Sequence, residues 1–259
     1  MKNLLHHGVR VLSLIVLSAL ALQLYFLARV ALMGVVDPQS TTFQRSEIRR
    51  IVGEQHRLLW SQEWVDHDRI SDHLKRAVIA SEDAGFAEHS GVEWDALEKA
   101  WEKNQRAEAQ AEKLNERLQR QAARSQRALP PAKPRVAKIV GGSTITQQLA
   151  KNLFLAGERN FARKGQEFVI TFMLEAILPK RRILEIYLNN VEWGEGLFGA
   201  EAAARHYFHV GAHQLSSFAA ARLAVMLPAP KRFEKRPGSA YVLGRASTVV
   251  ARMGGVELP

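Results

Sequence analysis

The stretch Gly-Gly-Ser-Thr-Ile-Thr-Gln-Gln-Leu-Ala-Lys-Asn-Leu-Phe, residues 141–154, is the most informative part of the chain. Its two glycines let the backbone approach a ligand closely, and Ser143 or Thr144 can cap a helix whose first N–H groups attract an anion. Helical spacing puts polar side chains on one face, namely Thr144, Gln148 and Lys151. It puts apolar side chains on another face, namely Ile145, Leu149 and Leu153. The pattern predicts a helix that binds with one face and packs with the other, although an ordinary capped amphipathic helix begins in the same way.

A cluster of cations follows this helix. Arg159 lies eight residues after Lys151, and the segment Arg163-Lys164-Gly165-Gln166-Glu167 ends the cluster in a carboxylate. Cations near a helix N-terminus suit a phosphate-bearing ligand. Taken alone, the arginines could equally be surface charges, and Glu167 could be an i, i+4 ion-pair partner of Arg163.

A carboxylate ends an apolar helix stripe further upstream. Ser71 or Asp72 can cap a helix whose aliphatic residues share one stripe with Glu82. Gly85 is a suitable stop, so Glu82 and Asp83 are expected in the last turn, where the negative end of the helix dipole disfavours their charge. Partial desolvation acts in the same direction, and both effects raise the pKa of Glu82 towards that of a useful general base.

The N-terminal segment is long and apolar enough to cross a membrane. Val11–Ala28 contains no charge, and the apolar run resumes from Val30 to Val36, which suffices for a hydrocarbon core of about 30 Å. The alternative is a signal peptide cleaved after Ala19-Leu20-Ala21, but the chain stays apolar well beyond that point. Lys2 and Arg10 precede the span, so the positive-inside rule predicts a cytoplasmic N-terminus.

The expected layout follows from these segments. Residues 1–10 would be cytoplasmic, 11–36 a transmembrane helix in the cell inner membrane, and 37–259 a periplasmic domain. Within that domain, residues 101–128 are rich in Gln, Ala, Glu, Arg and Lys and show no stripe that would face a core. A proline-rich segment at 130–134 then excludes further helix. We therefore expect residues 104–138 to form an inserted helical or flexible arm.

Composition narrows the classes of partner. A chain of 259 residues with 47% hydrophobic content supports one sizeable domain plus a small appendage. The absence of cysteine excludes disulfides. A net charge of +10 favours anionic partners, which could be nucleic acid, phospholipid headgroups or a pyrophosphate-bearing substrate. The anchor favours the last two.

The remaining segments predict a mainly α fold. Residues 168–178 are apolar nearly all round, which is typical of a helix buried in the middle of a domain, and Pro179 ends it. Further helices are expected over 183–191, 200–208 and 216–227, and there is little strand signal. The segment 41–68, with Trp60 and Trp64, fits either an element near the bilayer or ordinary core aromatics.

The chain resembles a known family in three blocks. They are residues 141–167, the segment Glu82-Asp83-Ala84-Gly85-Phe86-Ala87-Glu88-His89, and the segment Lys180-Arg181-Arg182-Ile183-Leu184-Glu185-Ile186-Tyr187-Leu188-Asn189. Together they are similar to the peptidoglycan glycosyltransferases, which polymerise lipid II. The likeness is strongest to the monofunctional members, which are related to the glycosyltransferase module of class A penicillin-binding proteins. It covers roughly residues 41–255 apart from the arm, and because no Ser-x-x-Lys occurs, a transpeptidase is not expected.

The resemblance implies a fold and a set of site residues. The fold would be a lysozyme-like helical domain with a small membrane-proximal lobe. Glu82 matches the catalytic base and Glu167 the second carboxylate. The positions that match substrate-binding residues are Asp83, Ser143, Gln148, Lys151, Asn152, Arg159, Arg163 and Lys164. The chain departs from the family pattern at Glu93, where Asp is more usual, at Val210, where many members carry lysine, and in the length of the arm.

The implied reaction is an inverting glycosyl transfer. Glu82 would take the proton of the 4-hydroxyl of the acceptor N-acetylglucosamine, which attacks the anomeric carbon of the donor N-acetylmuramic acid. Undecaprenyl diphosphate would leave, its growing charge held by Lys151 and Arg159. The implied partners are lipid II, the growing glycan chain, the membrane and proteins of cell-wall synthesis or division.

Other functions are open at this point. A lytic murein-cleaving enzyme would need a general acid and no cation cluster. A catalytically idle membrane scaffold and a tethered nucleic-acid binder are further alternatives, the last resting on charge alone, so nucleic acid is not an expected partner. The nine histidines show no metal-binding spacing, so neither a structural metal nor a cofactor is expected. A divalent cation such as Mg²⁺ at the diphosphate is left open.

Overall fold

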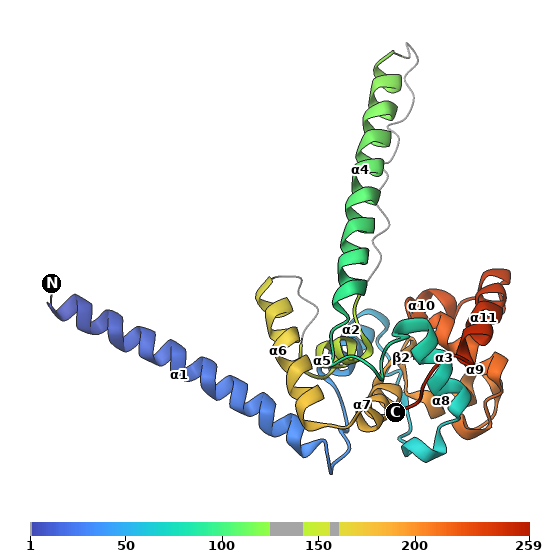
Figure 1. The fold of residues 1–259 in the computed structure, drawn as a ribbon, viewed down its shortest axis with the longest axis horizontal. Helices are drawn as coiled ribbons and strands as arrows, with labels where there is room; N and C mark the ends of the chain where they lie inside the picture. Colours follow the sequence, from blue (N-terminus) through green and yellow to red (C-terminus); the bar gives the residue numbers. More distant parts are fainter. Residues whose placement is uncertain (1, 125–141, 156–160) are drawn as a thin grey trace. The chain divides into compact units, whose positions relative to one another are not determined.

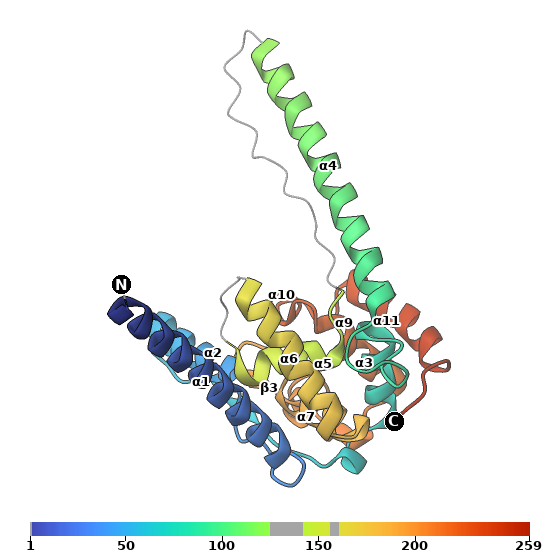
Figure 2. The same cartoon turned by 60° about the vertical axis from the view of Figure 1, so that its left-hand side comes forward.

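The computed structural model describes residues 2–124, 142–155 and 161–259, and these fall into two compact units. The first unit comprises residues 1–91 and 144–259, and the second comprises residues 92–143. Both are mainly helical, which confirms the predicted fold class (Figures 1 and 2).

The first unit consists of short and medium helices and one long N-terminal helix. In chain order they are α1 (Lys2–Leu32), α2 (Thr42–Gln55), the 3-10 helix η1 (His67–Arg69), α3 (Asp72–Glu82), α5 (Ile145–Phe154), α6 (Phe161–Ile177), α7 (Lys180–Asn190), α8 (Ala200–Phe208), the 3-10 helix η2 (Ala212–Gln214), α9 (Ser217–Met226), α10 (Pro230–Phe233) and α11 (Ala240–Met253). The helices expected at 200–208 and 216–227 are thereby confirmed as α8 and α9.

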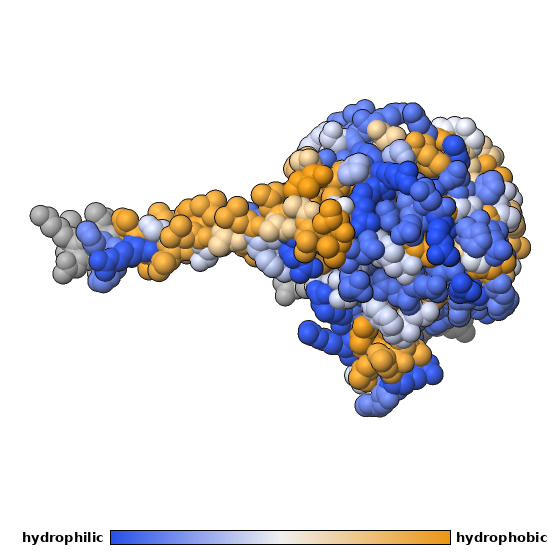
Figure 3. Space-filling model, turned by 90° about the horizontal axis from the view of Figure 1, so that it is seen from below, coloured by the Kyte–Doolittle hydropathy of each residue, from blue (hydrophilic) through white to orange (hydrophobic). Residues whose placement is uncertain are grey.

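Helix α1 has the length and composition of a membrane span. Its segment His6–Leu32 reaches a mean hydropathy of 2.3, and its apolar side chains are largely exposed. Figure 3 shows apolar surface along this projecting helix. Only its last turns are covered by protein, where Phe26, Val30 and Met33 are buried. Such a helix, apolar and uncovered along most of its length, is suited to a lipid environment.

Helix α2 joins the segment that follows α1 to the rest of the unit. A capping box between Thr41 and Gln44 begins the helix, and the Gln44 amide also donates to the carbonyl of Asn190 at 3.2 Å. Thr42 donates to the carbonyl of Leu153 at 3.0 Å, which ties α2 to the end of α5.

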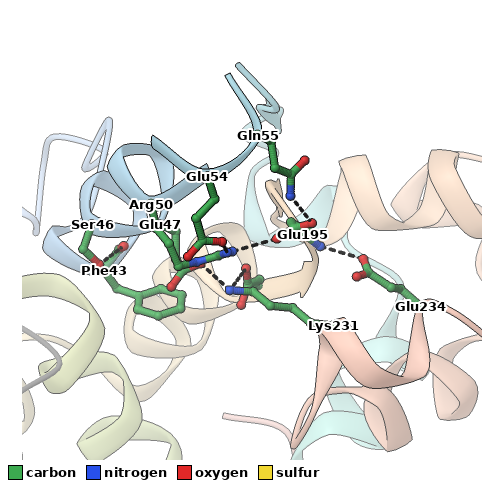
Figure 4. A network of polar contacts seen from close by, with 10 residues as sticks. Phe43, Ser46, Glu47, Arg50, Glu54, Gln55, Glu195, Lys231 and Glu234 are labelled. Carbon is green, nitrogen blue, oxygen red and sulfur yellow. Dashed lines mark hydrogen bonds and ion pairs between the residues drawn. The ribbon is translucent and has the colours of Figure 1, made fainter. Parts of the chain in front are cut away.

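A network of ion pairs holds the other side of α2 (Figure 4). Arg50 contacts Glu47 and Glu54 on its own helix and Glu195, at 2.7 Å, in the turn after residue 194. Lys231 of α10 contacts Glu47, so three separate segments meet at these charges.

The unit also contains a small sheet that the sequence did not predict. Strands β1 (Ser61–Gln62), β2 (Glu192–Gly194) and β3 (Leu197–Phe198) pair in the order β1-β3-β2, with β1 parallel to β3. Strands of two or three residues are too short to show period-two alternation, so pattern analysis could not find them.

Close helix packing forms the core around α3. This helix packs against α9 and α11, and the contact buries Leu74 and Val78 completely. The facing helix α9 carries buried alanines at 220, 221 and 224, whose small side chains let the helices approach closely.

Helix α6 corrects one expectation. Apart from a narrow polar stripe, its residues 168–178 were predicted to be buried in the middle of the domain, but Val169, Phe172 and Ile177 are exposed. The opposite face is buried, with Ile170 and Leu174 fully covered. An apolar helix need not be covered by protein when lipid can cover it, and α6 packs directly beside α1.

The two tryptophans of segment 41–68 behave as packing residues. The ring of Trp60 lies 5.1 Å from the ring of the buried Phe198. The guanidinium of Arg182 lies 5.5 Å over the ring of Trp64. Both are half-buried, which favours the core interpretation.

The second unit is dominated by one long helix, α4 (Trp94–Arg124). The helix starts earlier than the segment 101–128 suggested, and residues 125–141 lie outside the described residues. Two i, i+4 pairs support it, Glu102 with Arg106 at 3.0 Å and Glu116 with Arg120 at 3.4 Å. All four of these side chains are exposed, as expected of a solvated helix.

Candidate active site

Glu82 is the last residue of α3. Ser71 caps the helix by accepting a hydrogen bond from the backbone N–H of His73, and Asp83 is the C-cap. The helix therefore ends three residues before the expected stop at Gly85. This ending leaves Glu82 at the negative end of the helix, and its side chain is half-buried.

The Glu82 carboxylate is held by a chain of hydrogen bonds. The Nε2 group of Gln148 on α5 donates to Glu82 Oε2 at 3.0 Å. The hydroxyl of Tyr187 on α7 donates to Gln148 Oε1 at 3.0 Å. Because Tyr187 is almost completely buried, this relay fixes the amide orientation of Gln148 and thereby the position of the carboxylate.

The surroundings raise the pKa of Glu82. Burial is the largest cause, and the neighbouring negative charge of Asp83 adds to it, whereas the hydrogen bond from Gln148 opposes the shift. Burial also raises the pKa of Tyr187 well above its ordinary value, with contributions from Glu82 and Asp83, so the hydroxyl keeps its proton and remains a donor. A carboxylate with a raised pKa is suited to accept a proton near neutral pH.

Asp83 was expected to contact substrate, but its two oxygens contact protein. Oδ1 lies 2.7 Å from Nε2 of His89, and Oδ2 accepts from the backbone N–H of Ile145 at 2.9 Å. The carboxylate is 4% exposed, which leaves little surface for a ligand. The geometry supports a positioning role, in which Asp83 ties the end of α3 to the first residue of α5.

Thr144 caps α5. Its hydroxyl accepts from the backbone N–H of Gln147 while the Gln147 side chain accepts from the backbone N–H of Thr144, which completes a capping box. Of the two caps considered from the sequence, Thr144 is therefore the one used. Ser143 belongs to the second unit.

The packing face predicted for α5 is confirmed. Ile145, Leu149 and Leu153 are buried, as expected of the packing face. On the other face Gln148 is half-buried and Lys151, one turn later, is exposed.

Glu167 lies at the centre of the cation cluster on α6. Its Oε2 accepts from Arg163 at 3.2 Å, and its Oε1 contacts the ammonium group of Lys164. The carboxylate itself is buried. The ion-pair interpretation of Glu167 is thus correct as a description of the structure, and it leaves open a further role when a ligand displaces one of the cations.

Lys151 reaches the same cluster from α5. Desolvation by neighbouring atoms lowers its pKa, as do the positive charges of Arg163 and Lys164, while Glu167 opposes the shift. Asn152 follows on α5 and is half-buried. Arg159 lies outside the described residues.

Helix α5 therefore connects two groups of functional side chains. Gln148 contacts Glu82, and Lys151, three residues on, faces the cations around Glu167. The arrangement places a candidate proton acceptor and a concentration of positive charge along one helix.

Sequence reasoning missed two residues of this site. Tyr187 was named only within a block that resembles the family, and nothing in its local pattern shows that it orients Gln148. Gln147 could have been found, because Thr-Ile-Thr-Gln at 144–147 has the spacing of a capping box.

Comparison with known proteins identifies the family. The family model described as Transglycosylase matches residues 49–113 and 122–254. The chain is 49% identical over 240 residues to a biosynthetic peptidoglycan transglycosylase of Burkholderia thailandensis, covering 93% of this chain and 83% of the relative. It is 45% identical over 254 residues to the protein of the same name from Bordetella pertussis, covering 96% and 95%. A third such protein, from Herminiimonas arsenicoxydans, is 47% identical over 244 residues, covering 94% of each.

The family match also extends into the segment 104–138, which the resemblance had left out. The family model leaves out only residues 114–121 of the expected arm at 104–138, so most of that segment belongs to the matched family sequence. The resemblance stated from motifs is otherwise confirmed, and the chain belongs to the transglycosylase family, the peptidoglycan glycosyltransferases.

Proposed function

We propose that this protein polymerises lipid II into linear glycan strands, with Glu82 as the general base and the cations around Glu167 as the binding site for the leaving diphosphate. The observation that carries the proposal is helix α5, on which Gln148 donates to Glu82, while Lys151 lies near enough to Glu167, Arg163 and Lys164 on the adjoining α6 to interact with their charges. Glycosyl transfer from a lipid diphosphate needs both groups at one site, a base for the acceptor and positive charge for the leaving group.

The proposed step begins with the acceptor. Its 4-hydroxyl gives its proton to Glu82 as the oxygen attacks the anomeric carbon of the donor sugar. The bond from that carbon to the diphosphate oxygen breaks with inversion, and the charge that develops on undecaprenyl diphosphate is stabilised by Lys151, Arg159 and Arg163. No organic cofactor takes part in this scheme.

Glu167 has two consistent tasks in the proposal. It keeps Arg163 and Lys164 in place before substrate binds, and it balances their charge, so that the site is not a bare cluster of like charges. When the diphosphate binds, it competes with Glu167 for the same donors.

The proposed location is the outer face of the inner membrane. Lys2 and Arg10 favour a cytoplasmic N-terminus, and with α1 as a membrane span this orientation would put residue 37 onward in the periplasm. There the protein would meet lipid II and the proteins of cell-wall synthesis or division. A reporter that is active only in the periplasm, fused after Pro259, tests this orientation. The fusion should be active, and an inactive fusion would indicate the opposite orientation.

The decisive experiment offers purified full-length protein two substrates. With lipid II alone, the proposal expects polymer to appear that lysozyme digests. With preformed glycan strands, it expects no shortening. A raised carboxyl pKa also suits a general acid, so strands that shorten while lipid II stays intact would instead support the lytic function.

A further inference from the structure

The anchor helix carries one amide side chain that contacts the catalytic region. Gln23 lies within the uncharged stretch 11–28 of α1. Its Nε2 group donates to Oε1 of Gln166 on α6 at 2.8 Å, and Nε2 of Gln166 donates back to Oε1 of Gln23 at 3.0 Å. Both amides are thereby matched by a reciprocal pair of hydrogen bonds.

Apolar packing extends this contact towards the end of α1. The ring of Phe26 meets the ring of Phe154 edge-on at 5.3 Å, and Val30 is completely buried. An exposed membrane span would keep such side chains in lipid, whereas these are covered by the first unit. The last two turns of α1 are therefore docked on the protein.

A second polar contact fixes the point where the chain leaves the anchor. The guanidinium of Arg182 on α7 donates to the carbonyl of Met33 at 2.9 Å and to Asp37 at 2.6 Å. It also pairs with Glu185 at 3.0 Å. The anchor is thus held at Gln23 by α6 and just beyond its end by α7.

Gln166 lies beside the cation cluster, so the amide pair can affect the position of the cations. Gln166 directly precedes Glu167, and Arg163 and Lys164 lie within one turn of it. Helix α6 starts at Phe161, so Arg163 and Lys164 lie in its first turn, where backbone N–H groups lack intrahelical partners and a helix frays most easily, and Gln166 lies in the second turn. A contact at Gln166 restrains the turns that carry the cations.

We propose that Gln23 is a positioning residue for glycosyl transfer, which acts by holding the first turns of α6 through Gln166. The anchor is in this sense part of the site and does more than attach the enzyme to the membrane. A pair of amides is suited to the task because it is directional, and in hydrocarbon neither partner finds water as a substitute. The inference rests on the proposed role of the cation cluster.

The test compares Gln23→Leu with Ser18→Leu in the full-length protein. Ser18 lies on the exposed part of the same helix, so its variant controls for a more apolar span. We expect Gln23→Leu to lower kcat for lipid II polymerisation about tenfold, with the KM and the melting temperature nearly unchanged, in line with the modest energy of such a pair. Ser18→Leu should behave like the parent. Parental kcat in Gln23→Leu, or an equal loss in both variants, would overturn the proposal.

The double variant separates a specific pair from two independent effects. Gln166→Leu alone should lower kcat as Gln23→Leu does, and the two together should lower it no further, because either change already breaks the pair. Losses that multiply would mean that each glutamine acts through something else. Glu167→Gln is measured in parallel. If Glu167→Gln keeps the parental rate, the proposed role of the cation cluster is wrong and the inference about Gln23 fails with it. If Glu167→Gln loses activity while the Gln23 and Gln166 variants keep theirs, only the inference about Gln23 fails.

The absence of native cysteine allows a direct test of docking. Gln23→Cys and Gln166→Cys introduced together give the only two thiols, which a short bismaleimide can link in native membranes. We expect efficient intramolecular crosslinking and recovery of the activity that the two substitutions removed. Failure to crosslink, or a crosslinked enzyme that stays slow, would show that the docked anchor is not the working arrangement.

Discussion

Replacing Glu82 by glutamine is the sharpest test of the site, because the change removes charge and basicity while keeping shape. The glutamine Oε1 can still accept the hydrogen bond that Gln148 donates at 3.0 Å, and the buried Tyr187 behind it is untouched. The substitution also removes a partly desolvated negative charge beside Asp83. The variant should therefore fold and melt at least as well as the parent.

The rate should fall far more than the stability changes. Loss of general-base help costs about 10²- to 10⁴-fold, which corresponds to about 3–5 kcal/mol of transition-state stabilisation. Lipid II polymerisation followed under single-turnover conditions measures this loss without a contribution from product release.

The pH dependence of the polymerisation rate is a second test of the role of Glu82. Only the ionised carboxylate accepts a proton, so the parental rate should rise with pH through the raised pKa of Glu82 and then level off. The rate of Glu82→Gln should not rise with pH in this way. Glu88→Gln, on the exposed part of the following turn, is the matched control and should keep both the parental rate and its rise with pH. A Glu82→Gln rate within about threefold of the parent, far short of the expected range, would refute the assignment.

Three further predictions concern charge and backbone. In a polymerisation assay, Lys151→Ala should lower turnover by about 10²-fold, while Arg120→Ala, on exposed α4, should leave turnover unchanged. Equal effects of the two substitutions would mean that Lys151 contributes only general surface charge. Burial raises the pKa of Glu192 from 4.5 to about 7, so the folded protein favours the neutral carboxyl group. The free energy of unfolding should therefore fall as the pH rises from 4.5 through 7. In chemical denaturation, Glu192→Gln should be more stable than the parent by about 3 kcal/mol at pH 8 and equal to it below pH 4.5. Gly199 has φ +83°, and a Cβ there would lie 2.8 Å from the carbonyl oxygen of Asn189, so Gly199→Ala should cost at least about 1–3 kcal/mol, and an unchanged melting temperature would contradict this reasoning.

The helical part of the fold could be predicted because its signals are local. Ser71 and Ser216 cap α3 and α9 as their residue types suggest, and Pro179 precedes α7. The small sheet could not be predicted, because residue 61 pairs with residue 197 and no local pattern connects them. The exposed face of α6 was missed for a related reason, since composition alone does not distinguish protein from lipid as the cover of an apolar side chain.

The site was predicted in its residues more fully than in its contacts. The motifs named Glu82, Gln148, Lys151 and Glu167, and the structure puts Glu82 at the end of α3, Gln148 and Lys151 on α5, and Glu167 on α6. The motifs did not show that the Asp83 carboxylate forms hydrogen bonds with His89 and with the backbone N–H of Ile145, because hydrogen bonds between distant segments depend on the tertiary fold.

The packing of α3 has a consequence for how the protein matures. This helix, which ends at Glu82, finds its core partners in α9 and α11, and Arg76 on it contacts the carbonyl of Val256, three residues before the last residue printed. Contacts between segments so far apart in sequence form slowly, and they cannot form until both segments are on the same side of the membrane. A chain threaded outward from its anchor would therefore carry an unsupported α3 until α9 and α11 had crossed as well. The enzyme should thus stay inactive during export, and a chain arrested short of α11 should remain open to proteases in the compartment it has entered.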